Sequence, residues 1–138
     1  MKTTDDIDDI GIVTCTLLGE ARGEGKQGMQ AVANAIENRV LKPCWWGHTF
    51  REVCLKKYQF SCWLPNDPNR GKLLKFSELD PIYGVAEELA RKAMAGTLND
   101  ITNGATHYYA KNIKDLPNWA AGKKPCADIG HHLFFKGV

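Results

Sequence analysis

Apolar residues recur every three or four positions in three segments of this 138-residue chain, and this spacing constrains the fold more than any other feature. It predicts amphipathic helices over residues 5–22, over residues 27–41, and from Pro81 to a stop at Gly96. A chain of this length supplies one hydrophobic core, and we find no internal repeat or linker. We therefore expect a single domain over residues 1–138. No apolar run approaches the roughly 18 residues of a membrane span, so we expect no stable membrane association.

The expected helix ends follow from the residues at their boundaries. Thr4 is the expected N-cap of the first helix, and Gly23 breaks its apolar pattern. The second helix should end before Pro43, because the residue that precedes a proline avoids the helical region. Asp80 is a suitable N-cap for the third helix, in which Pro81 takes the first position.

The remaining segments are too short or too rich in turn residues for long helices. Residues 57–63 alternate aromatic and polar side chains in part, which favours a short strand or hairpin arm. Residues 105–110 and 129–135 are apolar and are interpreted as strands or extended arms. Together with the helices, these segments predict an α+β domain that is mainly α.

Charge and cysteine content argue against several classes of function. The net charge of +2 comes from 18 basic and 16 acidic side chains, which is too balanced to indicate a nucleic-acid partner. The five cysteines match no zinc-ligand spacing, so we expect no metal and no cofactor. Reduced thiols are the plain interpretation, and a disulfide between two of Cys44, Cys54 and Cys62 stays open. The acidic residues 1–6 lack the apolar centre of a secretory signal, which predicts synthesis in the cytoplasm.

Two glutamates, Glu20 and Glu24, are four residues apart and would share a helix face, with Cβ atoms about 5–6 Å apart. Neighbours on one face approach a substrate from the same side, so at most one of them should be a catalytic acid. Glu20 follows the apolar residues 12–18, and a carboxyl group held against apolar groups can stay protonated near neutral pH. Glu24 lies among glycines and should be solvated, or paired with Arg22 or Lys26. The plain alternative for Glu20 is a surface residue at a helix end.

Ordered blocks along the chain closely resemble the SleB-type cell-wall hydrolases, which are spore cortex-lytic enzymes and their phage and bacterial relatives. The resemblance covers roughly residues 10–135, and the order of the blocks makes it more specific than one glutamate motif. The blocks are residues 19–25, 28–34, 38–40, 59–63, 104–110, 119–120 and 129–135.

This resemblance implies a lysozyme-like fold, similar to goose-type lysozymes and lytic transglycosylases, with a small β-hairpin facing a helical lobe across a cleft. It implies cleavage of peptidoglycan glycan strands between N-acetylmuramic acid and N-acetylglucosamine. The position that matches the family's essential glutamate is Glu20. Many members carry a separate wall-binding domain, whereas we expect residues 1–138 to hold the catalytic domain alone, as a monomer.

In such a cleft, residues 59–63 would line the hairpin side. Gln59 and Ser61 can form hydrogen bonds with acetamido and hydroxyl groups, and Phe60 and Trp63 can stack on a sugar ring. The alternative for Phe60 and Trp63 is simple core packing.

Residues 107–109 should form a strand, in which alternate side chains take opposite faces. His107 and Tyr109 would then share one face and Tyr108 the other, with one set in the core and the other in the cleft. We expect the Tyr108 hydroxyl near the reacting sugar, and His107 either as a substrate contact or as a support for residues that contact the substrate. His131-His132 is interpreted as structural, because adjacent strand residues point apart and no further ligand stands at metal spacing.

No aspartate stands at a recognisable nucleophile position, since Asp67 falls in a Pro/Asn turn. The simplest mechanism is therefore a lytic transglycosylase that uses Glu20 as both acid and base and gives a 1,6-anhydro product. The alternatives are a hydrolytic muramidase with the same glutamate, a metal-dependent peptidoglycan amidase or peptidase, and a non-catalytic glycan-binding virion module. The setting we expect is a phage endolysin that a holin releases to the cell wall, or a virion-associated enzyme.

Overall fold

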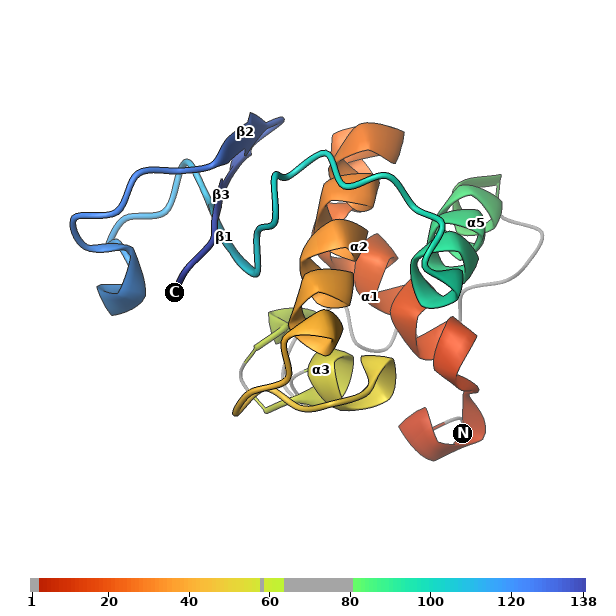
Figure 1. Cartoon of the computed structure of the whole chain (residues 1–138). Coiled ribbons are helices and arrows are strands. Elements are labelled where there is room, and N and C mark those ends of the chain that lie inside the picture. Colours follow the sequence, from red (N-terminus) through yellow and green to blue (C-terminus); the bar gives the residue numbers. More distant parts are fainter. Residues whose placement is uncertain (1–2, 58, 64–80) are drawn as a thin grey trace.

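The computed structural model describes residues 3–57, 59–63 and 81–138 (Figure 1). Helices form one side of the molecule and a small sheet the other. Among the described residues, no helix is long and apolar enough to cross a membrane. The helices are α1 (Asp9–Ala21), α2 (Gly25–Leu41), α3 (Phe50–Leu55) and α5 (Pro81–Ala95). The strands are β1 (His107–Ala110), β2 (Ala127–Ile129) and β3 (His132–Phe135), and short 3-10 turns cover Thr4–Asp6, Arg22–Glu24, Ser61–Trp63 and Asn118–Ala120.

Helix α1 lies at the centre of the helical side, where it packs against α2, α3 and α5. Ile12, Val13 and Leu17 are fully buried, and the burial extends to almost every face because the helix is apolar all round. The buried hydroxyls of Thr14 and Thr16 donate to backbone oxygens one turn earlier, at 2.7 Å each, so they cost the core no unsatisfied group.

The start of α1 differs from the sequence prediction. Asp8, not Thr4, is the N-cap, and its carboxylate accepts the backbone N–H of Gly11 at 2.8 Å. Thr4 instead begins a separate 3-10 turn, Thr4–Asp6. An aspartate cap satisfies an open backbone donor and also complements the positive helix end, so the helix begins four residues later than expected.

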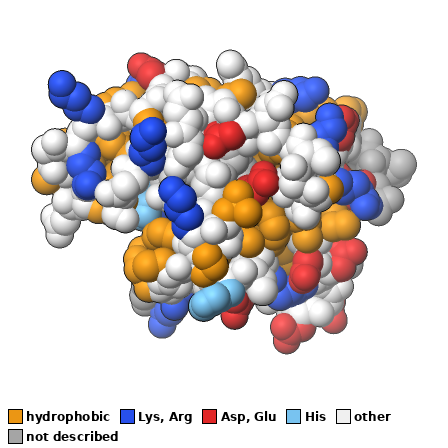
Figure 2. All heavy atoms as spheres, viewed as in Figure 1, with side chains coloured by type: hydrophobic (Ala, Val, Ile, Leu, Met, Phe, Trp, Pro, Cys, Tyr) orange, Lys and Arg blue, Asp and Glu red, His pale blue; other side chains and the backbone are white. Residues whose placement is uncertain are grey.

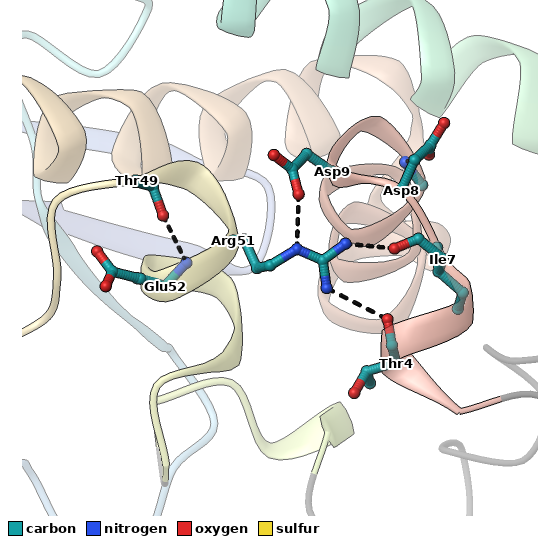
Figure 3. Close-up of polar contacts among 8 residues, drawn as sticks. Thr4, Ile7, Asp8, Asp9, Thr49, Arg51 and Glu52 are labelled. Atoms are coloured by element: carbon teal, nitrogen blue, oxygen red, sulfur yellow. Dashed lines mark hydrogen bonds and ion pairs between the residues drawn. The ribbon is translucent and has the colours of Figure 1, made fainter.

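Helix α3 was not predicted, because six residues are too few to show a helical period. It begins after Thr49, whose hydroxyl accepts the backbone N–H of Glu52 at 3.1 Å (Figure 3). Its Arg51 reaches the start of α1, where it donates to the Asp9 carboxylate at 2.6 Å and to the carbonyl oxygens of Thr4 and Ile7. This one side chain therefore ties α3 to the beginning of α1.

The second and third helices form as predicted, with α2 beginning at Gly25 and α5 at Pro81. The expected Asp80 cap and the Asp67 turn lie outside the described residues. The expectation of a strand over residues 57–63 is wrong where the structure describes it, because Ser61–Trp63 is a 3-10 turn. The turn packs its aromatic residues against α1 rather than against a neighbouring strand.

The two tail segments do form strands, in an antiparallel sheet of order β1-β3-β2. Tyr108 pairs with Phe134 between β1 and β3, and Asp128 pairs with Leu133 between β2 and β3. The expected single arm 129–135 is divided by a turn at Gly130, whose φ of +57° suits glycine. Within residues 81–138 the hairpin is therefore β2–β3, near the C-terminus.

Polar side chains of α2 fix the segment that leads from α5 to β1. Asn34 donates to the carbonyl oxygen of Asn99 at 3.0 Å and accepts the backbone N–H of Ile101 at 2.9 Å. Asn38 donates to the carbonyl oxygen of Ala105 at 2.9 Å. These bonds hold the start of the sheet beside α2.

Charges are unevenly distributed over the surface. Figure 2 shows basic side chains over the C-terminal sheet on the left and also towards the right, while acidic ones gather towards the N-terminal end at lower right. Five lysines of the C-terminal part are exposed, namely Lys111, Lys114, Lys123, Lys124 and Lys136. The near-zero net charge therefore hides a local basic excess beside the sheet.

The five cysteines are all free thiols in the structure, so the disulfide left open by the sequence is not formed. Cys15, Cys54 and Cys62 are buried and pack as small apolar residues. Burial raises the pKa of Cys54 to about 12, which keeps its thiol protonated.

Candidate active site

A cavity of about 230 Å³ lies where the end of α1, helix α2 and strand β1 meet. Five of its lining residues were predicted from the sequence, and Arg39 and Trp119 were not. The lining residues are Glu20, Arg39, Gln59, Phe60, His107, Tyr108 and Trp119.

Glu20 occupies the last turn of α1 and is half-buried. The Tyr108 hydroxyl, from β1, donates to Glu20 Oε1 at 2.7 Å. Burial, followed by the neighbouring Glu20 charge and the hydrogen bond to it, raises the pKa of Tyr108 well above its ordinary value. The phenol therefore stays protonated and acts as a fixed donor to the carboxylate.

Arg39 projects from α2 and is buried beneath the cavity. Its Nε donates to the carbonyl oxygen of Thr106 at 2.6 Å, and its Nη1 donates to Gln59 Oε1 at 3.3 Å. The guanidinium lies over the rings of Trp46 and Phe60 at 5.6 and 5.5 Å. Burial lowers the pKa of Arg39, but an arginine remains charged at any working pH. It thus places a fixed positive charge beside Glu20.

His107 and Trp119 form the outer wall of the cavity, with ring centroids 5.0 Å apart. His107 Nδ1 lies 2.8 Å from the Thr106 hydroxyl. Burial, and then the Arg39 charge, lower the pKa of His107 to about 4, so its ring is neutral near pH 7. The prediction that His107 and Tyr108 divide between core and cleft is wrong, because both line the same cavity. The alternation itself holds, because Tyr109 contacts Trp119 as His107 does, at 6.0 and 5.0 Å between ring centroids, whereas Tyr108 contacts Phe134.

The predicted residues of segment 59–63 do not all reach the cavity. Gln59 and Phe60 line it, from a turn rather than from the expected hairpin. Trp63 is only 7% exposed and lies in the core, where its indole N–H donates to the Thr16 hydroxyl at 2.8 Å. This is the alternative that the sequence left open for Trp63. The side chain of Ser61 lies outside the described residues, so its contact with substrate stays a prediction.

Glu24 is not the solvated side chain that the sequence suggested. Its side chain is 12% exposed and accepts the backbone N–H of His131 at 2.8 Å. His132 Nδ1 lies 3.1 Å from the same carboxylate oxygen. Sequence reasoning missed this pairing because the partners come from the far end of the chain.

The two adjacent histidines do not take opposite faces of a strand, because His131 lies in the turn before β3 and both rings approach the Glu24 carboxylate, at 4.0 Å for His131 and 3.1 Å for His132. Their side chains are 85% exposed for His131 and 12% for His132. Across the described part of the chain, no three His, Cys, Asp or Glu side chains gather as a metal site would require.

Arg39 and Trp119 fall within blocks 38–40 and 119–120 of the family resemblance, but the sequence analysis gave neither a role at the site. Arg39 stands beside the apolar stripe of α2. Only its burial in the folded protein shows that this charged residue belongs to the site. Trp119 lies in a short segment between Pro117 and Gly122, where an aromatic residue among turn formers hints at a binding surface.

Comparison with known proteins agrees with this geometry. The sequence model of a family described as Cell Wall Hydrolase matches residues 23–135, beginning just after Glu20. A spore cortex-lytic enzyme of Halalkalibacterium halodurans is 29% identical over 132 residues, or 91% of this chain and 34% of that protein. The chain thus spans about a third of the length of this curated relative.

Two solved structures share the fold at 24% identity. The catalytic domain of the Bacillus cereus SleB protein has a TM-score of 0.72 and is matched over 93% of this chain and 89% of its own. The catalytic domain of the germination-specific lytic transglycosylase SleB from Bacillus anthracis has a TM-score of 0.70, with 93% of each chain covered. These likenesses confirm the predicted lysozyme-like α+β fold.

Proposed function

The chain belongs to the cell wall hydrolase family, and from this premise we propose that it cleaves peptidoglycan glycan strands as a lytic transglycosylase. The bond cut would join N-acetylmuramic acid to N-acetylglucosamine. The observation that carries the proposal is the 2.7 Å hydrogen bond from Tyr108 to Glu20 at the wall of the cavity. The Bacillus anthracis relative in this comparison is a lytic transglycosylase, which supports the same reaction class.

Glu20 is the proposed general acid. Among the described residues that line the cavity, it is the one with a carboxyl group. A pair of carboxylates about 5–9.5 Å apart is what most glycoside hydrolases use, so this lining favours a route that needs a single glutamate. Tyr108 fixes Oε1 of Glu20 and with it the plane of the carboxyl group, which orients the proton towards the glycosidic oxygen.

The reaction then balances without a second protein carboxylate. Glu20 gives its proton to the glycosidic oxygen as the bond from that oxygen to C1 of the muramic acid breaks. The resulting Glu20 carboxylate takes the proton of the C6 hydroxyl, whose oxygen bonds to C1 and closes the 1,6-anhydro ring. The proton is restored to Glu20, no water is consumed, and the Tyr108 phenol and the Arg39 charge stabilise the carboxylate between the two steps.

The other lining residues would hold the sugar. The ring of Trp119 is half-buried and can stack on a sugar face, while the Gln59 amide can donate to a hydroxyl or acetamido group. Phe60 is 3% exposed, so it supports the Arg39 guanidinium rather than offering a free ring face. His107, which is neutral, can exchange hydrogen bonds with substrate without carrying charge.

The test compares Glu20→Gln with wild type in zymograms that contain purified peptidoglycan. Glutamine keeps the shape of the side chain but cannot deliver the proton, so we expect clearing to fall by at least about a hundredfold. Glu88→Gln is the matched control, since Glu88 is exposed on α5 and forms an ion pair with Lys92 at 3.0 Å. Equal clearing by Glu20→Gln and wild type would overturn the role of Glu20.

The place of action, a cell wall reached after release by a holin or from a virion, stays a prediction of the sequence.

A further inference from the structure

The second carboxylate of the 19–25 segment contacts the β2–β3 hairpin rather than the cavity. Glu24 Oε1 accepts the backbone N–H of His131 at 2.8 Å and lies 3.1 Å from His132 Nδ1. Glu24 ends the 3-10 turn between α1 and α2, so its carboxylate joins the corner of the two helices directly to the turn of the hairpin.

The hairpin turn is shaped to admit this carboxylate. Gly130 has a φ of +57°, and a Cβ atom built on it would lie 3.1 Å from Glu24 Oε2. Any other residue would have to adopt a disfavoured backbone conformation and also push the carboxylate away. The turn is therefore adapted to Glu24 in two respects: its backbone conformation favours glycine, and a side chain at Gly130 would crowd the carboxylate.

His132 connects Glu24 to the cavity, because it also contacts Tyr108. Its ring meets the Tyr108 ring edge-on at 5.1 Å, and Phe134 of the same strand packs on Tyr108 at 5.3 Å. Tyr108 is also the direct strand partner of Phe134. The Tyr108 hydroxyl that bonds Glu20 is thus oriented by two side chains of β3, and Glu24 holds one of them.

The charges around His132 favour a hydrogen bond to Glu24. The titratable groups that face His132 are Glu24, His131 and Tyr108. Burial lowers the pKa of His132, with the Glu24 charge opposing this and the His131 charge adding to it. A neutral ring with its proton on Nδ1 can donate to the Glu24 carboxylate, as a charge-assisted bond.

We propose that Glu24 is a positioning residue that, through His132 and the His131 amide, aims the Tyr108 hydroxyl at Glu20. The two glutamates at the corner between α1 and α2 then have different roles. Glu20 contacts the sugar, and Glu24 positions the sheet whose Tyr108 hydroxyl orients Glu20. This inference rests on the proposed role of Glu20.

The experiment is a double-mutant cycle between Glu24→Ala and Tyr108→Phe in the full chain, with kcat and KM measured on soluble glycan strands. In the wild-type background, Glu24→Ala should lower kcat about 10–100-fold, because a misplacement of about 1 Å can cost that much, and should change KM little. In the Tyr108→Phe background the same change should cost no more than about twofold. Glu88→Ala is the matched control and should change neither constant.

A purely structural role for Glu24 would give the same loss in both backgrounds, and that result would overturn the proposal, as would an unchanged kcat in Glu24→Ala. If Glu24→Ala does not fold, Glu24→Gln and His132→Phe enter the cycle in its place and are read the same way.

A second readout separates this proposal from that for Glu20. The ring resonances of Tyr108 in tyrosine-labelled protein, assigned by their loss in Tyr108→Phe, should move in Glu24→Ala but not in Glu88→Ala. Activity retained by Glu20→Gln would contradict the proposed function, and the Tyr108 resonances would still decide the positioning. Unmoved resonances in Glu24→Ala would overturn the positioning role of Glu24 and leave the proposed function of the chain unaffected.

Discussion

Helix α1 and the C-terminal sheet meet at the same cavity, but different forces hold them. Helix α1 is enclosed by apolar side chains from three other helices. The sheet has a smaller apolar cluster around Phe134 and is joined to the helices by polar contacts from Asn38, Arg39 and Glu24. Apolar burial is non-directional, whereas hydrogen bonds depend on geometry. We infer that the helical side supplies most of the stability and that the polar junction supplies the alignment of the site.

The largest effect should come from the apolar side. Leu17→Ala removes a fully buried side chain from the centre of α1. We expect the free energy of unfolding to fall by about 2–5 kcal/mol, while kcat of the folded enzyme stays within about twofold. Denaturant unfolding and initial rates at low temperature measure the two quantities. A large loss of kcat in a fully folded sample would break the comparison.

The next effect belongs to the site. Tyr108→Phe keeps the ring packed between His132 and Phe134 but removes the hydroxyl that donates to Glu20. We expect kcat to fall about 10–100-fold, with little change in Tm. Steady-state kinetics and a thermal melt check both parts, and wild-type kcat in this variant would show that the hydrogen bond has no role in turnover.

The junction between the two regions should show an intermediate effect. Asn34→Ala removes the amide that bonds Asn99 and Ile101 and leaves the backbone N–H of Ile101 without its acceptor, while the Asn99 carbonyl oxygen still accepts from Gln30 at 3.0 Å. We expect the free energy of unfolding to fall by about 1–3 kcal/mol. Chemical denaturation measures the loss, and Gln27→Ala, at an exposed position of α2, is the control. Equal stability of the two variants would show that Asn34 does not stabilise the junction.

The smallest effect is a pH dependence. His107 has a pKa of about 4 in the folded protein, against an ordinary value of 6.5. Between these values the unfolded chain binds a proton at this residue that the folded chain does not, so stability falls as the pH falls through this window. The Tm of His107→Gln should therefore drop less than that of wild type between pH 7 and pH 4.5. Parallel curves would contradict the buried, neutral state of His107.

The sequence predicted the elements whose signal is local. The apolar period gave α2 and α5, and the apolar tail segments gave the strands. Helix α3 was too short to show a period. The aromatic alternation over 57–63 was mistaken for a strand, because a buried turn with Phe60 and Trp63 leaves the same pattern.

The sequence predicted the site residues on which family resemblance and local pattern agree. It missed the residues whose position depends on partners far along the chain. Glu20 and Tyr108 meet in the structure, although the expected division of His107 and Tyr108 between core and cleft was wrong. Arg39 depends on Thr106, and Glu24 depends on the β2–β3 turn. Those partners lie far along the chain, so neither spacing nor composition reveals them.

The most direct test of the central claim is the product that wild type releases from purified peptidoglycan in water enriched in heavy oxygen. If Glu20 acts alone as acid and base, mass spectrometry will find 1,6-anhydro-muramic ends that carry no heavy oxygen, and Glu20→Gln will release none. Reducing ends in excess of those of undigested peptidoglycan, each heavier by one water than the anhydro product, would show that water attacks instead and would contradict the transglycosylase mechanism.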